Sequence, residues 1–125
     1  MREIETDAAP APVGPYSQAV IHGDLLFASG QVPLDPRTGA LVEGEIEDET
    51  RQVISNLRAV LEAGGSSLAQ VIRTTVYVTD LSLFGRINAV YEAAFTGDPR
   101  PARVTIQAAA LPLGARVEID AVAAL

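Results

Sequence analysis

The sequence predicts one α+β domain in which a mixed β-sheet has two helices packed on one of its faces. Two segments carry the 3.6-residue apolar period of amphipathic helices, and the other apolar runs are short, as in strands. Helical and strand segments follow one another along the chain in an order that favours a sheet covered by helices. Residues 14–125 contain no linker, repeat or low-complexity tract, so we expect a single domain over residues 1–125.

The first expected element is an extended N-terminal segment, residues 1–13, which is acidic and ends in alternating Ala and Pro. We expect it to be loosely structured, and because it lacks an apolar h-region we do not expect a signal peptide. Segments 18–21 and 25–28 are apolar runs on either side of His22-Gly23-Asp24, which predicts a β-hairpin with His22 in its turn. Residues 33–39 contain two Pro and one Gly and predict an irregular loop.

Residues 46–63 predict a long helix, because apolar residues recur along them at spacings of three and four. Asp48 and Glu49 lie in its first turn, where the helix dipole favours negative charge, and Gly64-Gly65 favours an end at residue 63. The apolar face of this helix is expected to consist of Val53, Ile54, Leu57, Val60 and Leu61.

A strand is predicted over residues 71–79, in which Val, Ile and Tyr alternate with Thr and Arg. Ser82 is then expected to cap a second helix. Two further strands, 102–108 and 116–124, are predicted on either side of a turn at Pro112 and Gly114. The apolar side of the second helix is expected to consist of Phe84, Ile87, Tyr91, Ala94 and Phe95.

Two helices can cover only one face of such a sheet. Depending on the register of the strands, the opposite face would carry Val104 and Ile106 or Val117 and Ile119. The chain has no further element to cover an apolar face of this kind. We therefore expect the protein to self-associate into a closed symmetric oligomer.

The amino-acid composition excludes several kinds of chemistry. The chain has no Cys, no Lys and a single His, which excludes thiolate nucleophiles, zinc–thiolate sites, lysine Schiff bases and histidine-rich metal centres within one chain. Arginine, carboxylates, hydroxyls, amides and the backbone remain. An enzyme built from these groups would bind an anion with Arg and transfer protons with Asp or Glu.

The net charge of −7 opposes binding to nucleic acid, whose phosphates require a basic surface, and no run of Arg is visible. The longest apolar runs are shorter than the roughly 18 residues that a membrane span requires. We therefore expect a cytoplasmic protein whose partners include neither nucleic acid nor a membrane. A small anion can still be held by one buried Arg.

Arg103 and Glu118 are the first candidates for a functional site. Arg103 lies near the start of a predicted strand, where it is either an ordinary surface Arg or a fork that grips a substrate carboxylate. Glu118 lies between Val117 and Ile119 and shares a strand face with Asp120. It is therefore either part of a solvated face or a partly buried general acid and base.

Two loop-like clusters flank the predicted hairpin, Gly14-Pro15-Tyr16-Ser17 and Ala28-Ser29-Gly30-Gln31. As bare patterns they are weak, since neither is a phosphate-binding loop and the serines lack the partners needed for nucleophilic attack. Asn88 lies in the middle of the second predicted helix, where a solvent-facing amide is the plain expectation. These patterns alone indicate a globular α+β domain with a candidate anion site.

Taken together, the segments resemble the reactive-intermediate deaminase family, also called Rid or YjgF. The resemblance holds in order and spacing over nearly the whole chain. It is carried by residues 11–19 (APVGPYSQA), 29–33 (SGQVP), 50–64, 74–80 (TTVYVTD), 84–91, 101–103 (PAR) and 117–119 (VEI).

The resemblance, to members of the RidA type, implies a chorismate-mutase-like fold that forms a homotrimer with ligand clefts between subunits. It implies hydrolysis of 2-iminobutanoate, 2-iminopropanoate and their enamine tautomers to 2-oxo acids and ammonia, with no cofactor and no metal. Such imino acids are released by pyridoxal-phosphate-dependent dehydratases. Carried over by position, Arg103 would hold the substrate carboxylate and Glu118 would place and activate the attacking water. The same pocket would be shaped by Tyr16, Ser29, Gly30, Asn88 and Thr105.

Two features depart from the family pattern. Thr105 stands where many RidA members have Cys, which affects the size and polarity of the pocket. The segment 96–100 before Pro101 is shorter than in many members, which leaves the rim of the cleft and the range of substrates open. The presence of both Arg103 and Glu118 indicates the deaminase-competent branch of the family.

Three other functions remain open. A non-catalytic or regulatory trimer could bind 2-oxo acids on Arg103 without turnover. A ribonuclease or translation-inhibitor role, as described for some relatives, is disfavoured by the negative charge and by the lack of a histidine pair. A chorismate-mutase-like isomerase is disfavoured because one Arg in the cleft is too few for a dicarboxylate.

Overall fold

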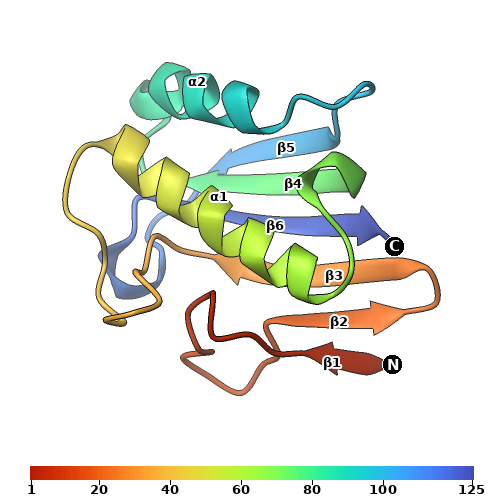
Figure 1. Cartoon of the computed structure of the whole chain (residues 1–125). Coiled ribbons are helices and arrows are strands. Elements are labelled where there is room, and N and C mark those ends of the chain that lie inside the picture. The colour runs from red at the N-terminus through yellow and green to blue at the C-terminus, as the bar shows by residue number, and fades with distance from the viewer.

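The computed structural model describes all 125 residues and contains one six-stranded β-sheet with two helices lying across one of its faces (Figure 1). The strand order is β1-β2-β3-β6-β4-β5, and every neighbouring pair is antiparallel except β4 and β5. The predicted α+β class with a mixed sheet is therefore confirmed. The strands are β1 (Arg2–Ile4), β2 (Ala19–His22), β3 (Leu25–Gln31), β4 (Val71–Val78), β5 (Ala102–Gln107) and β6 (Val117–Ala124), and the helices are α1 (Ile46–Ala63) and α2 (Phe84–Ala94).

The helix α1 has the bounds that its apolar period predicts. Its first turn is closed by Asp48, whose carboxylate accepts a hydrogen bond from the Glu45 backbone N–H at 2.9 Å. Its buried face packs on the sheet, and Val53, Leu57 and Leu61 are fully buried. Neither α1 nor α2 combines the length and the apolar character that crossing a lipid bilayer requires.

The start of α2 differs from the prediction that Ser82 caps it. A 3₁₀ turn, Leu81–Leu83, comes first, and the Asp80 carboxylate accepts a hydrogen bond from the Ser82 N–H at 2.9 Å. Because Asp80 already satisfies this donor, Ser82 lies inside the turn, and α2 begins only at Phe84. The apolar side of α2 is as predicted at Ile87 and Tyr91, which are buried.

The N-terminal segment is more ordered than its sequence predicts. The strand β1 pairs with β2, and Ile4 is buried in the core. The buried side chain of Gln18 fixes the following residues, because its amide donates to the Thr6 carbonyl at 3.0 Å and to the Pro10 carbonyl at 2.9 Å. These hydrogen bonds hold the chain that leads to Tyr16 against the sheet.

The register of the strands decides which apolar residues lie on the face that the helices leave open. Val117 and Ile119 of β6 are fully buried on the helix-covered face. Val104 and Ile106 of β5 lie opposite Thr75 and Tyr77 of β4, on the other face, and remain 41% and 45% exposed. Phe27 of β3 lies on the same face and is 42% exposed, but β6 and β4 separate its strand from β5. No element of this chain covers this open face (Figure 1).

Candidate active site

Arg103 lies on β5 at the edge of the sheet, on the face toward α2. Its guanidinium carbon is 4.7 Å from the centre of the Tyr91 ring and 5.4 Å from that of Phe84. One guanidinium nitrogen donates a hydrogen bond to Oδ1 of Asn88 at 2.7 Å. Since Phe84, Asn88 and Tyr91 are spaced four and three residues apart, they share one face of α2 and meet the arginine together.

This environment leaves the charge of Arg103 without a partner of opposite sign. The arginines that form ion pairs are Arg37, Arg51, Arg86 and Arg116. Arg103 is half-buried and is held by one neutral amide and two aromatic faces, so donors of its guanidinium remain for a carboxylate. The expectation that Asn88 faces solvent is wrong, because its amide oxygen is bound to this side chain.

Arg103 lines a cavity of about 360 Å³, which we call the Arg103 cavity. Its wall also contains two charged residues that the sequence motifs did not single out, Arg100 and Glu92. The only signals for them are local: Arg100 directly precedes Pro101, and Glu92 follows Asn88 by one helical turn. The expectation that a single Arg serves this cleft is therefore wrong. The Arg103 cavity is lined by Asn88, Tyr91, Glu92, Arg100, Pro101 and Arg103.

Glu118 lies on β6, on the open face of the sheet, and is half-buried. It shares this face with Asp120, as the strand period predicts. Burial raises the pKa of Glu118, and the negative charge of Asp120 raises this pKa further. Asp120 accepts hydrogen bonds from the Thr75 N–H and the Tyr77 hydroxyl, both at 3.1 Å, whereas the Glu118 carboxylate accepts none from the rest of the chain. Glu118 is therefore the carboxylate that is free to bind water.

Gly30 makes room for Glu118. A Cβ atom at residue 30 would collide with the Glu118 carboxylate, so only glycine allows this close approach. Ser29 beside it donates a hydrogen bond to the Ser17 carbonyl at 2.6 Å, and the Tyr16 hydroxyl accepts one from the Val13 N–H at 3.2 Å. The end of β3, the segment around Tyr16 and strand β6 together form a cavity of about 320 Å³, the Glu118 cavity, lined by Val13, Tyr16, Ser29, Gly30, Val32, Pro112 and Glu118.

The structure thus brings Asn88 together with Arg103, and Tyr16, Ser29 and Gly30 together with Glu118. It does not bring Arg103 and Glu118 together within one chain. The two residues point to opposite faces of the sheet, and β4 lies between their strands. Thr105 follows Arg103 on the same face of β5 and is half-buried, but it lines neither cavity.

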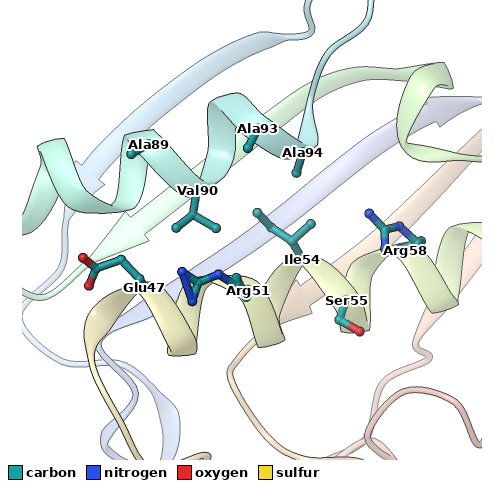
Figure 2. Close-up of a pocket in the computed structure, with 9 residues that line it drawn as sticks. All are labelled: Glu47, Arg51, Ile54, Ser55, Arg58, Ala89, Val90, Ala93 and Ala94. Carbon is teal, nitrogen blue, oxygen red and sulfur yellow. The ribbon is translucent and has the colours of Figure 1, made fainter.

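A third and larger cavity, of about 520 Å³, lies between α1 and α2 and contains none of the predicted site residues. Figure 2 shows its apolar floor, with Ile54 on one helix and Val90 on the other, and two arginines along α1. Its one carboxylate, Glu47, pairs with Arg86 at 2.7 Å, which lowers the pKa of Glu47. The structure has no group of three or more His, Asp or Glu side chains that could hold a metal ion.

Comparison with known proteins adds the family context. Residues 6–125 match the model of the family described as endoribonuclease L-PSP. A RutC family protein of Pyrococcus horikoshii is 49% identical over 120 residues, which cover 96% of this chain and 94% of that protein. A 2-iminobutanoate/2-iminopropanoate deaminase of Mus musculus is 47% identical over 120 residues, which cover 96% of this chain and 88% of that protein. The crystal structure of RidA from an Antarctic Psychrobacter species is 44% identical, with a TM-score of 0.95 over 100% of both chains.

Proposed function

Since this chain belongs to the endoribonuclease L-PSP family, also called YjgF or Rid, we propose that it hydrolyses reactive 2-imino acids and their enamine tautomers to 2-oxo acids and ammonia. The proposed substrates include 2-iminobutanoate and 2-iminopropanoate, which cytoplasmic dehydratases would supply. The observation that carries the proposal is the half-buried Arg103 guanidinium, which lines a cavity without a carboxylate partner. Such a guanidinium suits the carboxylate that every 2-imino acid carries.

Glu118 supplies the proton transfers in this proposal. Water adds to the carbon of the protonated imine while the Glu118 carboxylate takes a proton from this water, which gives a neutral carbinolamine. The Glu118 carboxyl group then donates this proton to the nitrogen. The C–N bond breaks, ammonia leaves, and the carbonyl forms as the hydroxyl group gives its proton back to the Glu118 carboxylate. A raised pKa suits both halves of this cycle, because the group must accept and then donate a proton near neutral pH.

The reaction requires Arg103 and Glu118 to act on one substrate, although they lie on opposite faces of a single sheet. We therefore propose a homotrimer in which the Arg103 cavity of one subunit meets the Glu118 cavity of the next. Each Arg103 cavity then receives Glu118 from a neighbouring subunit, so that both residues face the same substrate. The exposed apolar side chains Phe27, Val104 and Ile106 support this assembly, because burying them against other copies would stabilise the oligomer.

The alternatives differ in what they predict. A non-catalytic trimer would bind 2-oxo acids on Arg103 without accelerating hydrolysis, and an isomerase would release no ammonia. The family description names an endoribonuclease, but the single histidine, His22, is exposed at the end of β2 and lines neither cavity. The net charge of −7 also opposes RNA binding, so the arrangement favours the deaminase.

The test is competition between hydrolysis and chemical trapping. Threonine dehydratase generates 2-iminobutanoate in the presence of semicarbazide, and the rate of semicarbazone formation is recorded with and without this protein. We expect the wild type to suppress trapping catalytically, and Arg103→Ala to lose at least about 100-fold in this activity, because the substrate is no longer oriented. Arg58→Ala removes an exposed arginine outside both cavities and is the matched control.

The same assay separates the alternatives. Glu118→Gln should lose turnover while it still binds 2-oxobutanoate, because the Arg103 cavity is intact. Full activity in Arg103→Ala would contradict the proposed role of this residue. Saturable 2-oxobutanoate binding by a wild type that does not affect trapping would support the non-catalytic trimer instead.

A further inference from the structure

The connection between α2 and β5 places a second arginine beside the proposed substrate site. Arg100 precedes Pro101, and Arg103 is the second residue of β5, so the two lie three residues apart across a short rigid segment. Both line the Arg103 cavity. In the sequence this segment stood out only because it is short, and the proposed hydrolysis of monocarboxylic imines makes no use of Arg100.

Neither guanidinium is neutralised by a neighbouring carboxylate. The ion pairs of the chain involve other arginines, and Glu92, which lines the same cavity from α2, lies beyond ion-pair distance of both Arg100 and Arg103. The cavity wall therefore carries two guanidinium groups that no carboxylate of the chain neutralises. Their placement favours a ligand that itself brings two negative groups.

The two arginines differ in how firmly they are held. Arg103 is fixed by the hydrogen bond to Asn88 and by the Tyr91 and Phe84 rings, so it suits the carboxylate next to the reacting carbon. Arg100 is exposed at the rim, and its side chain forms no hydrogen bond with the rest of the chain. A long side chain of this kind can close on a group at the far end of a substrate.

We propose that Arg100 binds a second carboxylate of the substrate, so that the site accepts 2-imino acids derived from dicarboxylic amino acids of four or five carbons. This inference rests on the proposed function for the reaction, but the binding that it describes does not require turnover. The Arg103 cavity, at about 360 Å³, has the size of a small-molecule site and can contain such a ligand.

The binding test uses two stable product analogues that differ only in the terminal carboxylate, 2-oxoglutarate and 2-oxopentanoate. Isothermal titration measures both Kd values for the wild type, for Arg100→Ala and for Arg58→Ala, which removes an unpaired arginine from the cavity between the helices. We expect the wild type to bind 2-oxoglutarate about 10-fold more tightly, the effect of one charge-assisted contact. Arg100→Ala should abolish this preference, and Arg58→Ala should retain it.

Turnover is tested with the matching imines. Flavin-dependent amino-acid oxidases generate 2-iminoglutarate from glutamate and 2-iminopentanoate from norvaline, and semicarbazide traps each imine. The expected result is that Arg100→Ala lowers the ratio of kcat/KM for the dicarboxylic over the monocarboxylic imine about 10-fold. Glu92→Gln should raise the same ratio, because it removes a repelling charge from the cavity wall.

The outcomes separate this inference from the proposed function. A wild type that binds 2-oxoglutarate in an Arg100-dependent manner but hydrolyses neither imine supports the second carboxylate site and contradicts the deaminase. A wild type that hydrolyses 2-iminopentanoate but shows no preference for the dicarboxylic ligand overturns the inference alone. If Arg100→Ala weakens the binding of both ligands equally, the inference is also overturned, because Arg100 would then make no distinction between one carboxylate and two.

Discussion

The contact between Gly30 and Glu118 places an ionisable group in a costly position. Glu118 is half-buried, approaches a backbone that carries no Cβ, and receives no hydrogen bond from the chain to offset its lost hydration. Burial is the main reason that the pKa of Glu118 is raised, and the negative charge of Asp120 raises this pKa further. Active sites commonly contain a carboxylate whose charged form lowers the stability of the fold but whose raised pKa serves proton transfer.

The first prediction concerns the pH dependence of stability. Because the native state holds the Glu118 proton more tightly than the unfolded chain, the favourable contribution of this carboxyl group is fully present below the unfolded pKa of about 4.3. It is lost as the pH rises through the raised native pKa. Gln is neutral throughout, so Glu118→Gln should match the wild type at acidic pH and exceed its stability at neutral pH.

The measurement is urea denaturation of both proteins at one protein concentration, at pH values from about 4 to 8. Glu62→Gln, at an exposed carboxylate of α1, controls for the removal of one negative charge from an acidic protein. A Glu118→Gln variant that is less stable than the wild type at neutral pH would contradict the assigned cost of burying this charge.

At the level of elements, the helix α1 positions the loop that follows β3. Asn56 is 1% exposed, and its amide nitrogen donates to the carbonyl groups of Val32 at 3.1 Å and Leu34 at 2.9 Å. Its amide oxygen accepts from Gln52 at 2.9 Å. Since Val32 lies two residues after Gly30 and lines the Glu118 cavity, the core of the helix layer determines the shape of one wall of the site.

The second prediction follows from these buried hydrogen bonds. Asn56→Leu keeps the number and branching of the side-chain heavy atoms but leaves the buried Leu34 carbonyl without a donor and the Val32 carbonyl with only the Leu34 N–H, so we expect a loss of about 2–4 kcal/mol in the free energy of unfolding. Gln52→Ala removes only the outer partner and should cost less than about 1.5 kcal/mol. Equal losses in the two variants, measured by urea denaturation, would show that the carbonyl contacts carry no particular weight.

The elements also show why only part of this structure could be predicted. The bounds of α1 follow from a local period that eighteen successive residues repeat. β1 has three residues, too few for a pattern, and it is held by its pairing with β2, in which Ile4 lies opposite Ala19 and Arg2 opposite Ile21. The hydrogen bond between Asn88 and Arg103 depends on the parallel pairing of β4 and β5, which no local sequence pattern predicts. The finding that Arg103 and Glu118 lie on opposite faces of the sheet depends on the same long-range pairing, of β4 with β5 and with β6.

In the whole molecule, one face of the sheet is covered by the helices and the other is left open. The helices bury the first, and the second exposes apolar side chains next to polar groups such as Glu118. A chain of this shape would gain stability if further copies of itself covered the open face. The proposed trimer would cover the open face and would also bring the Arg103 cavity of one subunit to the Glu118 cavity of the next.

The third prediction tests this coupling of assembly and activity. Ile106→Asp introduces a charge into the exposed apolar strip of β5, so we expect the oligomer to dissociate and imine hydrolysis to be lost while the circular dichroism spectrum is retained. Ser55→Asp adds the same charge to the exposed surface of α1 and should leave both properties unchanged.

Analytical ultracentrifugation of the three proteins at equal concentration gives the assembly state, and the trapping assay gives the activity. An Ile106→Asp variant that sediments like the wild type would refute the open face as the surface of assembly. An active monomer would refute the sharing of the site between subunits.

The position of Arg103 and Glu118 on opposite faces of one sheet also bears on inheritance. A cell that carries two defective alleles, one encoding Arg103→Ala and the other Glu118→Gln, makes no subunit in which both residues are intact. In mixed assemblies of the proposed kind, however, the intact Arg103 of one product can meet the intact Glu118 of the other. Two recessive lesions in the same gene would then complement each other, as lesions in different genes usually do.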